Sequence, residues 1–128
     1  MILLTIDEII VLHEKLLAAT GGTPGLRDQG LLESAVFGIN ASFEDIEQYP
    51  TVEEKAARLA YALVANHAFV DGNKRIGVLA MLMTLALNEA TLHYKQEELI
   101  KLGLDAASGV IQYYGILKWI EQHEDRKT

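Results

Sequence analysis

The chain has 128 residues, of which 50% are hydrophobic, 11 are basic and 18 are acidic, which gives a formal net charge of −7. This length suits one domain spanning residues 1–128, and the apolar content suffices for one buried core. The negative charge opposes general binding to nucleic acid or to an anionic membrane surface, and the lack of cysteine excludes disulfides and cysteine-ligated zinc.

The first residues, Met1 to Glu8, lack the basic flank and the uninterrupted apolar stretch of a secretory signal. An apolar run covers Ile76–Leu87, but it is shorter than the roughly 20 residues that a membrane-spanning helix needs. We therefore expect a cytoplasmic protein with no membrane partner, in which this run is a buried core helix.

A first helix is predicted after Thr5, because Thr5 and Glu8 have the spacing of a capping box, in which each side chain satisfies a free backbone N–H. Apolar residues recur at largely helical spacing as far as Leu17. Gly21-Gly22 should end this helix, because glycine accepts positive φ at little cost. Asp28 is then expected to cap a short second helix.

The segment Gly38–Pro50 mixes turn formers with isolated large apolar residues, which predicts a loop or a short hairpin. Directly after it, Thr51 and Glu54 repeat the capping-box spacing, and Ala56–Ala65 is apolar on nearly every side. This pattern predicts a central buried helix. A second helix that is apolar all round is predicted over residues 73–88.

In the last third of the chain, apolar residues between Leu99 and Ile120 predict one or two amphipathic helices that wrap the central pair. The polar end, Gln122–Thr128, is expected to fray. No alternating apolar run is long enough to build a sheet. The predicted fold class is therefore all-α, with about six helices around a central buried helical pair and at most a small hairpin.

The segment His67–Arg75 reads His-Ala-Phe-Val-Asp-Gly-Asn-Lys-Arg and lies between the two central helices. A helix N-terminus exposes unpaired N–H groups and the positive end of the helix dipole, so it can bind phosphate. Such a terminus carries Asn73, Lys74 and Arg75 here. Cations at this end oppose the dipole, and a bound anion would explain them. Gly72 should allow tight chain reversal and close approach of a ligand oxygen to the backbone.

Two further side chains of the segment suit catalysis. His67 could accept the proton of an attacking hydroxyl, because imidazole titrates near working pH. Asp71 is the only carboxylate of the segment and suits Mg²⁺, which often shares oxygen ligands with nucleotide phosphates. Phe69 is expected to anchor the loop in the core. Each residue alone has an ordinary explanation as a cap, a turn or a solvated charge, but the combination is more specific than its parts.

Other chemistry finds little support. The remaining histidines, His13, His93 and His123, lack metal-ligand spacing and are expected to be surface or hydrogen-bonded residues, so no zinc site is predicted. Arg27 and Asp28 are interpreted as a helix cap with a neighbouring charge, with a place beside the site as the alternative. The nucleophile elbow and the Walker and dinucleotide-binding glycine patterns are absent.

The pattern of His67–Arg75 resembles the signature of Fic/Doc proteins, and Lys74 points to the Doc branch, the death-on-curing toxins of toxin–antitoxin systems. The chain length, Gly25–Asp28 followed by Leu31–Ala35, and the helical order are similar to that branch as well. The resemblance implies an all-α Fic fold that uses ATP and Mg²⁺. It also implies these roles: His67 as base, Asp71 as the Mg²⁺ ligand, Gly72, Asn73, Lys74 and Arg75 as phosphate ligands, and Lys74 and Arg75 as catalytic cations.

In Doc-like toxins, a lysine at the position of Lys74 accompanies an inverted nucleotide, so that the γ-phosphate meets the target hydroxyl. Most AMP-transferring Fic enzymes have a second glycine there. The resemblance thus implies a protein kinase that acts on a target protein, a translation elongation factor, and stops translation. Gly72 is instead typical of AMP-transferring members, whereas Doc has alanine there, so AMP transfer is the alternative. A non-catalytic helical binding protein is the second alternative.

Gly38–Pro50 corresponds to the flap of this family, which holds an extended segment of the target by backbone pairing. Phe43, Ile46 and Tyr49 are candidates for that contact, and core packing would explain each equally well. The family's inhibitory pattern, Ser/Thr-x-x-x-Glu followed by Gly or Asn, is absent. The resemblance therefore implies a separate antitoxin, a disordered segment that folds onto exposed apolar surface.

Overall fold

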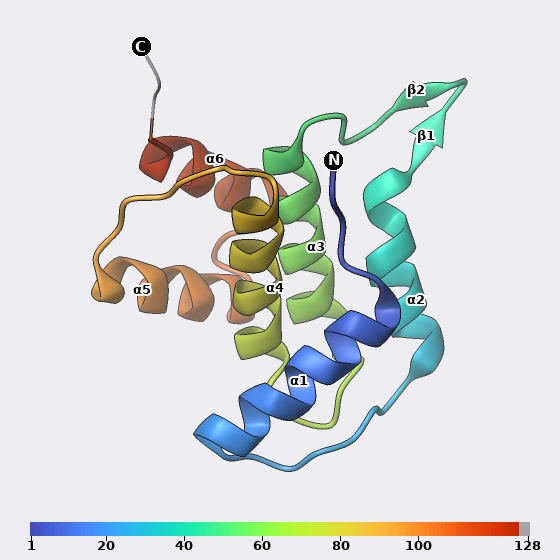
Figure 1. Ribbon diagram of the computed structural model, residues 1–128, viewed down its shortest axis with the longest axis vertical. Coiled ribbons are helices and arrows are strands. Elements are labelled where there is room, and N and C mark those ends of the chain that lie inside the picture. Colours follow the sequence, from blue (N-terminus) through green and yellow to red (C-terminus); the bar gives the residue numbers. More distant parts are fainter. Residues whose placement is uncertain (126–128) are drawn as a thin grey trace.

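The computed structural model describes residues 1–125, and this part of the chain forms six α-helices, one short 3₁₀-helix and one small hairpin (Figure 1). In chain order the elements are α1 (Ile6–Thr20), α2 (Gln29–Phe37), η1 (Gly38–Asn40), β1 (Ser42–Phe43), β2 (Ile46–Glu47), α3 (Val52–Asn66), α4 (Asn73–Leu87), α5 (Gln96–Ala107) and α6 (Tyr113–His123). The predicted all-α class is confirmed.

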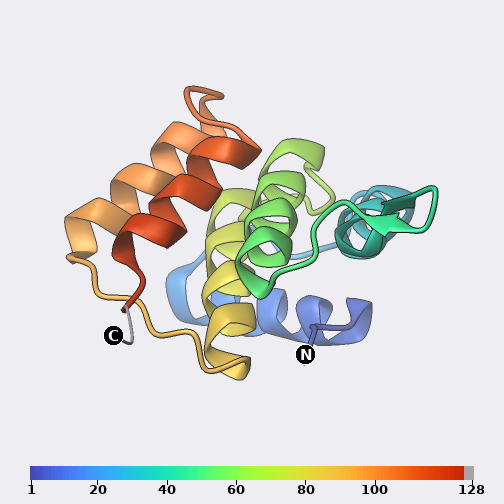
Figure 2. The ribbon, with the colours of Figure 1, turned by 90° about the horizontal axis from the view of Figure 1, so that it is seen from above.

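The helices α3 and α4 lie side by side at the centre, between α5 and α6 on one side and α1 and α2 on the other (Figures 1 and 2). Both helices carry fully buried side chains, among them Leu59, Leu63 and Ile76. The two helices approach closely at Gly77, where an added Cβ would lie 2.7 Å from Cγ2 of Val64. The predicted central pair is confirmed, and its loop is the segment that carries the motif.

The helix starts follow the predicted caps. In α1 the amide of Glu8 donates to the Thr5 hydroxyl over 3.1 Å, and the amide of Thr5 donates to the Glu8 carboxylate over 3.0 Å. The same reciprocal pair starts α3 at Thr51 and Glu54. The Asp28 carboxylate accepts from an amide in the first turn of α2. Each cap of this kind stabilises its helix by about 1 kcal/mol. Because a cap depends on residues only three positions apart, the sequence pattern was enough to locate these helix starts.

The predicted fraying of Gln122–Thr128 is wrong as far as Asp125, and residues 126–128 lie outside the described part of the chain. Helix α6 continues to His123, whose Nε2 lies 2.8 Å from a carboxylate oxygen of Glu98 in α5. The amide of Asp125 donates to the carbonyl of Thr91 over 2.8 Å. These contacts come from distant parts of the chain, so the local polarity of the segment did not reveal them.

No helix within residues 1–125 has the length and apolar character needed to cross a membrane.

Candidate active site

The loop between α3 and α4 begins at His67, which ends α3 in the left-handed conformation with φ 52° and ψ 48°. Arg27 supports this turn, because its Nε donates to the carbonyl of His67 over 2.7 Å and its Nη2 to that of Asn66 over 3.1 Å. Arg27 thus caps the C-terminus of α3. The His67 side chain is exposed, and no hydrogen bond occupies its ring within residues 1–125. It is therefore accessible to a substrate.

The loop is fixed along the segment that precedes α2. The carbonyl of Ala68 accepts from the amides of Arg27 and Asp28 at 2.7 and 2.9 Å, and the amide of Val70 donates to the carbonyl of Gly25 over 3.0 Å. Phe69, between these contacts, is 2% exposed, as expected for the anchor of the loop. The cap interpretation of Arg27 and Asp28 holds, and Arg27 also lies against the loop.

The side chain of Asn73, the first residue of α4, forms two hydrogen bonds with the backbone of Phe69 in the loop. Its Nδ2 donates to the carbonyl of Phe69 over 2.9 Å, and its Oδ1 accepts from the amide of Phe69 over 3.0 Å. The side chain is buried and both of its polar atoms are used. These two hydrogen bonds hold the Asn73 side chain against the loop, and its backbone N–H, at the start of α4, has no intrahelical partner.

Gly72 precedes α4 with φ 76°, a left-handed conformation that favours glycine. The expected tight chain reversal is confirmed. However, a Cβ at this position would meet Cδ2 of Leu17 at 3.0 Å and Nε2 of His13 at 3.5 Å. The missing Cβ points toward α1 and would also lie 3.4 Å from Nη2 of Arg75, and the close approach of a ligand oxygen to the Gly72 backbone stays a prediction. Gly72 is needed for backbone conformation and for packing on α1.

The Asp71 carboxylate is held by two backbone amides. Its Oδ2 accepts from Thr23 over 3.0 Å and its Oδ1 from Gly72 over 2.8 Å. These two hydrogen bonds, with smaller electrostatic contributions from Arg75 and His13, outweigh desolvation and hold the pKa of Asp71 below its usual value. The group is therefore ionised in neutral solution. Each oxygen keeps a further lone pair, because a carboxylate offers about four acceptor sites.

This carboxylate fits Mg²⁺ as a single protein ligand. Mg²⁺ takes oxygen ligands and usually completes its coordination with water and substrate phosphates rather than with a full set of protein groups. Within residues 1–125, no three His, Asp or Glu side chains cluster as a metal site. One ionised carboxylate at Asp71 could thus supply the single protein ligand that such a cation needs.

His13 belongs to the site although the motif does not contain it. Its ring is 2% exposed and stacks on Phe69 with centroids 3.8 Å apart and planes at 15°. Its Nε2 lies 2.8 Å from the carbonyl oxygen of Asp71. Because a carbonyl only accepts, Nε2 carries the hydrogen and donates it. The prediction of a surface or hydrogen-bonded histidine is confirmed in its second form, but its position beneath the loop was missed.

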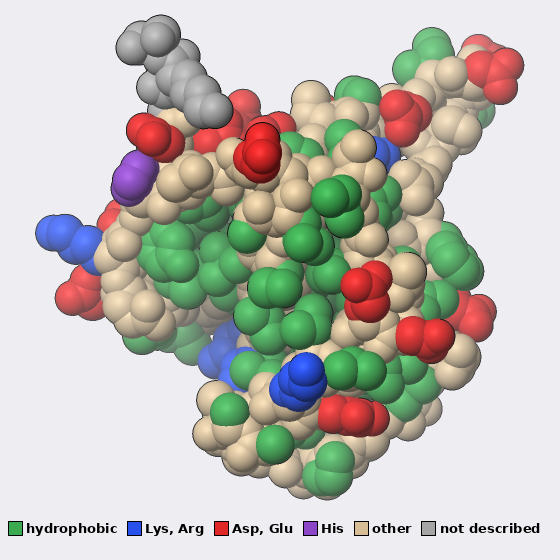
Figure 3. Space-filling model, viewed as in Figure 1, with side chains coloured by type: hydrophobic (Ala, Val, Ile, Leu, Met, Phe, Trp, Pro, Cys, Tyr) green, Lys and Arg blue, Asp and Glu red, His purple; other side chains and the backbone are tan. Residues whose placement is uncertain are grey.

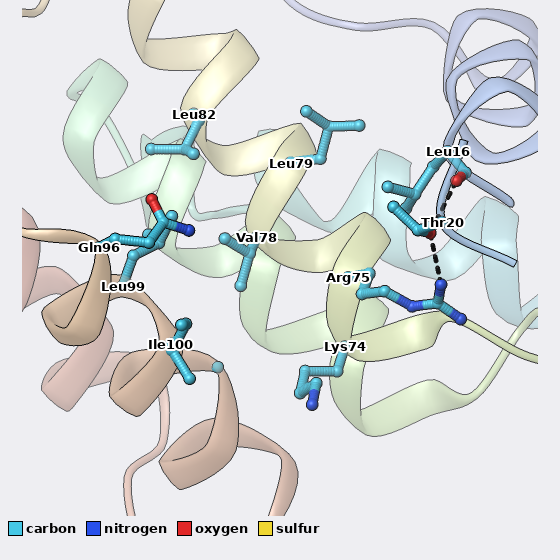
Figure 4. Close-up of a pocket in the computed structure, with 11 residues that line it drawn as sticks. Leu16, Thr20, Lys74, Arg75, Val78, Leu79, Leu82, Gln96, Leu99 and Ile100 are labelled. Atoms are coloured by element: carbon cyan, nitrogen blue, oxygen red, sulfur yellow. Dashed lines mark hydrogen bonds between the residues drawn. The ribbon is translucent and has the colours of Figure 1, made fainter.

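The two cations of the motif, Lys74 and Arg75, differ in the number of partners that they contact. Nη1 of Arg75 donates to the Thr20 hydroxyl over 2.6 Å (Figure 4). It also donates to the Gly21 carbonyl over 2.8 Å, and Nη2 lies 3.7 Å from Asp71. Lys74 is exposed, and within residues 1–125 its ammonium makes no hydrogen bond or ion pair. No side chain caps α4 either. The first amides of α4 and the Lys74 ammonium are thus available to an anion.

A groove of about 380 Å³ extends from these cations between α1, α4 and α5 (Figure 4). Apart from Thr20, Lys74, Arg75 and Gln96, its lining is apolar or glycine: Leu16, Val78, Leu79, Leu82, Leu99, Ile100 and Gly103. Figure 3 shows apolar side chains gathered over α4 and α5 on this face. Neither His67 nor Asp71 lines this groove. The groove therefore adjoins the motif at Lys74 and Arg75.

The hairpin β1–β2 projects from the body beside α2, with acidic side chains at its tip (Figures 1 and 3). Phe43 pairs with Ile46, and both side chains are 68% exposed, so core packing does not explain them. Tyr49, by contrast, packs edge-on against Tyr113 of α6 with centroids 5.1 Å apart. Two of the three candidates for target contact are therefore accessible.

Comparisons with known proteins agree with this geometry. Residues 3–85, more than half of the chain, match the model of the Fic/DOC family. The chain is 42% identical over 74 residues to the Toxin Doc of Mycolicibacterium smegmatis, covering 58% of this chain and 57% of that protein. It is 30% identical over 105 residues to the Protein kinase doc of Escherichia phage P1, covering 82% of each chain. The chain therefore belongs to the Fic/Doc family.

Proposed function

We propose that this protein is a Doc-type toxin that transfers the γ-phosphate of ATP to a hydroxyl side chain of a target protein. The similarity to a protein named Toxin Doc supports the toxin role, and the similarity over 82% of both chains to one named Protein kinase doc supports the phosphoryl transfer. The target that we propose is a translation elongation factor, whose modification would stop translation.

In the proposed reaction, His67 accepts the proton of the target hydroxyl while the hydroxyl oxygen bonds to the γ-phosphorus. The bond from phosphorus to the bridging oxygen of ADP breaks, and ADP leaves with the electron pair. Lys74, Arg75 and the first amides of α4 bind the phosphate oxygens and stabilise their charge. Mg²⁺, held by Asp71, would neutralise phosphate charge when bound. Positioning and electrostatics supply most of the catalysis in such reactions.

The observation that carries the choice of phosphoryl transfer is Lys74. Arg75 is engaged by α1, whereas the Lys74 ammonium has no partner within residues 1–125. An unpaired cation at an uncapped helix N-terminus is suited to the terminal phosphate of a nucleotide. This supports the inverted nucleotide placement that the lysine form of the motif implies.

The test uses ATP labelled at the α- or the γ-phosphate, incubated with the purified protein, Mg²⁺ and candidate translation factors. We expect label from the γ-position alone in the recipient, with a mass gain of about 80 Da per site, the mass of one phosphoryl group. Label transferred from the α-phosphate would overturn the kinase assignment. It would establish the alternative, AMP transfer, which Gly72 favours as the residue typical of that group.

The second alternative is a non-catalytic helical binding protein. It predicts that His67→Ala has no effect on growth inhibition, because no proton transfer would be needed. We expect instead that this variant folds normally, since the ring is exposed, and no longer inhibits growth. Unchanged toxicity of the folded variant would favour the binding protein.

We also propose that a separate antitoxin binds in the groove between α1, α4 and α5. Its apolar lining fits the apolar face of a helix that folds on binding, and Lys74 and Arg75 at its end fit an acidic side chain of that helix. A partner held there would screen the cations from ATP. Co-expression of the antitoxin should therefore restore growth and lower the affinity of the complex for ATP.

A further inference from the structure

Asp71 and Arg75 carry opposite charges and lie four residues apart across the start of α4, yet they do not meet at hydrogen-bond distance. Nη2 of Arg75 lies 3.7 Å from Oδ1 of Asp71. A charge-assisted hydrogen bond between such groups is shorter, at about 2.7–2.9 Å, and a guanidinium often binds both oxygens of a carboxylate. Other partners must therefore hold the two groups in this open arrangement.

Those partners belong to the turn after α1, residues 20–23. The amide of Thr23 donates to Oδ2 of Asp71 over 3.0 Å. Nη1 of Arg75 donates to the Thr20 hydroxyl over 2.6 Å and to the carbonyl of the next residue over 2.8 Å. One short turn thus offers a donor to the carboxylate and two acceptors to the guanidinium, so each ion has partners other than the opposite charge.

The hydroxyl of Thr20 is oriented as an acceptor for Arg75. Its oxygen lies 2.8 Å from the carbonyl oxygen of Leu16, and because a carbonyl only accepts, the single hydroxyl hydrogen points to Leu16 (Figure 4). The lone pairs of the oxygen are left for the guanidinium. Both hydrogen bonds of Arg75 within residues 1–125 start from Nη1, which leaves the N–H groups of Nη2 and Nε for a phosphate.

Gly22, in the middle of this turn, has no room for a side chain. An added Cβ would lie 2.8 Å from Oδ2 of Asp71 and 3.0 Å from Nη2 of Arg75, closer than side chains normally approach. The residue also has φ 127°, a conformation that favours glycine. The ends of the two charged side chains thus occupy the place of the missing Cβ, and the turn can contact both only because glycine stands here.

We propose that the turn, residues 20–23, keeps Asp71 and Arg75 from neutralising each other, and that Gly22 is the positioning residue that makes this possible. The carboxylate then keeps lone pairs for a divalent cation, and the guanidinium keeps N–H groups for a phosphate oxygen. This inference rests on the proposed function, because it assumes that the loop binds a cation together with a nucleotide. Gly22 acts through Asp71 and Arg75, so its effect is on the binding of these ligands.

Disruption of the turn should let the two ions form a direct pair. A carboxylate that accepts from a guanidinium has fewer lone pairs for a cation, and the positive charge beside it opposes the binding of Mg²⁺. We therefore expect weaker cation binding whenever the turn loses its contacts with either side chain.

Two pairs of variants test the proposal. Gly22→Ala places a methyl group against both ions, and its matched control, Gly109→Ala, makes the same change at a glycine with φ 80° and nothing within 4 Å of the added Cβ. Thr20→Val removes one acceptor of Arg75, and Thr20→Ser retains the hydroxyl. Thermal unfolding is measured first, and the Thr20 pair keeps the test valid if Gly22→Ala fails to fold.

The first readout is the affinity for Mn²⁺ in the presence of a non-hydrolysable ATP analogue, measured by electron paramagnetic resonance, which does not depend on transfer. We expect several-fold weaker binding in Gly22→Ala and Thr20→Val and wild-type affinity in Gly109→Ala. Thr20→Ser should recover the affinity that Thr20→Val loses. Asp71→Asn should abolish the binding, which assigns the measured site to Asp71.

Wild-type affinity in those of Gly22→Ala and Thr20→Val that fold would overturn the proposal. Mn²⁺ binding that survives in Asp71→Asn, or that is absent from the wild type, would overturn it as well, because the inference assigns the cation to Asp71.

The second readout is the Mg²⁺ concentration that gives half of the maximal rate of transfer to the recipient identified by labelling. We expect this concentration to rise several-fold in Gly22→Ala, with part of the rate recovered at high Mg²⁺, because mass action compensates for weaker binding. A lower rate with an unchanged Mg²⁺ requirement would contradict the positioning role. If labelling finds no transfer at all, the proposed function fails, and the Mn²⁺ comparison still decides this inference.

Discussion

His13 contacts the loop between α3 and α4 from a helix that lies 58 residues earlier in the chain. The types and the order of the candidate groups are local, so the motif alone was enough to propose them. It did not predict what holds them. Thr23 and Arg27, which support Asp71 and His67, lie 48 and 40 residues before them, and no local periodicity marks such contacts.

The contact between His13 and Asp71 can be tested by substitution. In His13→Leu the carbonyl of Asp71 loses its donor, and we expect a loss of about 1–3 kcal/mol in the free energy of unfolding, measured with denaturant. His13→Gln retains an N–H donor of similar reach and should recover part of this loss. The leucine variant should also bind ATP with Mg²⁺ more weakly by calorimetry. An equal loss in both variants would assign the stabilisation to ring stacking on Phe69 instead.

A substitution at Gly72 can separate two effects of an added methyl group on the free energy of unfolding. One is the cost of a left-handed backbone, and the other is the contact of the new Cβ with α1. In Gly72→Ala a left-handed backbone costs about 1–2 kcal/mol, and the new Cβ also meets Leu17. The control is Gly109→Ala, which has φ 80° but nothing within 4 Å of the added Cβ. We expect the larger loss in unfolding free energy at Gly72. Equal losses would show that α1 adjusts without cost.

The helices themselves were predicted from their ends. Caps at Thr5, Asp28 and Thr51 are decided by residues three positions apart, so a reader of the sequence can find them. The contact between α5 and α6 was missed because it joins Glu98 and His123 across 25 residues. The hydrophobic pattern predicted that the C-terminal helices wrap the central pair, but not which side chains of α5 and α6 meet.

The pair of Glu98 and His123 should make stability depend on pH. Burial opposes charge on His123, but the hydrogen bonds to Glu98 and to the Trp119 carbonyl outweigh it and raise the pKa of His123. The hydrogen bonds from His123 and the Lys95 amide lower the pKa of Glu98. Because the pKa of His123 is raised, its contribution to stability is fully present at a pH below the pKa of histidine in the unfolded chain. Because the pKa of Glu98 is lowered, its contribution is present at a pH above the pKa of glutamate in the unfolded chain. Together they give a window from about pH 4.3 to about pH 6.5.

The measurement compares wild type with Glu98→Gln by denaturant unfolding at pH 5.5 and pH 8. We expect the difference in unfolding free energy to be larger at pH 5.5, because His123 loses its proton as the pH rises through its folded pKa. Glu97→Gln, a neighbouring charge with no hydrogen bond to His123, serves as the control. A difference that is the same at both pH values would mean that the pair is not charged.

At the scale of the whole molecule, the central position of α3 and α4 was predictable because both are apolar on nearly all sides. The burial of Lys55 was not predicted. A lysine that follows two glutamates in a first helical turn has the pattern of a solvated surface, and its acceptors lie 8 to 16 residues earlier in a segment without periodicity. The groove beside Lys74 could not be predicted from the sequence either, because residues of three separate helices line it.

The groove offers a test of antitoxin binding. Ile100 lines it and is 54% exposed, so Ile100→Asp should change the free energy of unfolding by no more than about 0.5 kcal/mol. We expect the variant to remain toxic but to escape rescue by the co-expressed antitoxin. Val110→Asp, at a residue that is 73% exposed and outside the groove lining, is the control and should still be rescued. Rescue of both variants would place the antitoxin elsewhere.

The position of the loop between two consecutive helices has a consequence for folding. Helix α3, the loop and α4 are neighbours in the chain, and the Asn73–Phe69 ring spans four residues, so these contacts close with little loss of chain entropy. The contacts of His13 and Thr23 with Asp71 require α1 and its following loop to return from a distant part of the chain. A chain in which α3, the loop and α4 have formed before α1 docks would therefore lack the hydrogen bonds with His13 and Thr23 that hold Asp71 in place.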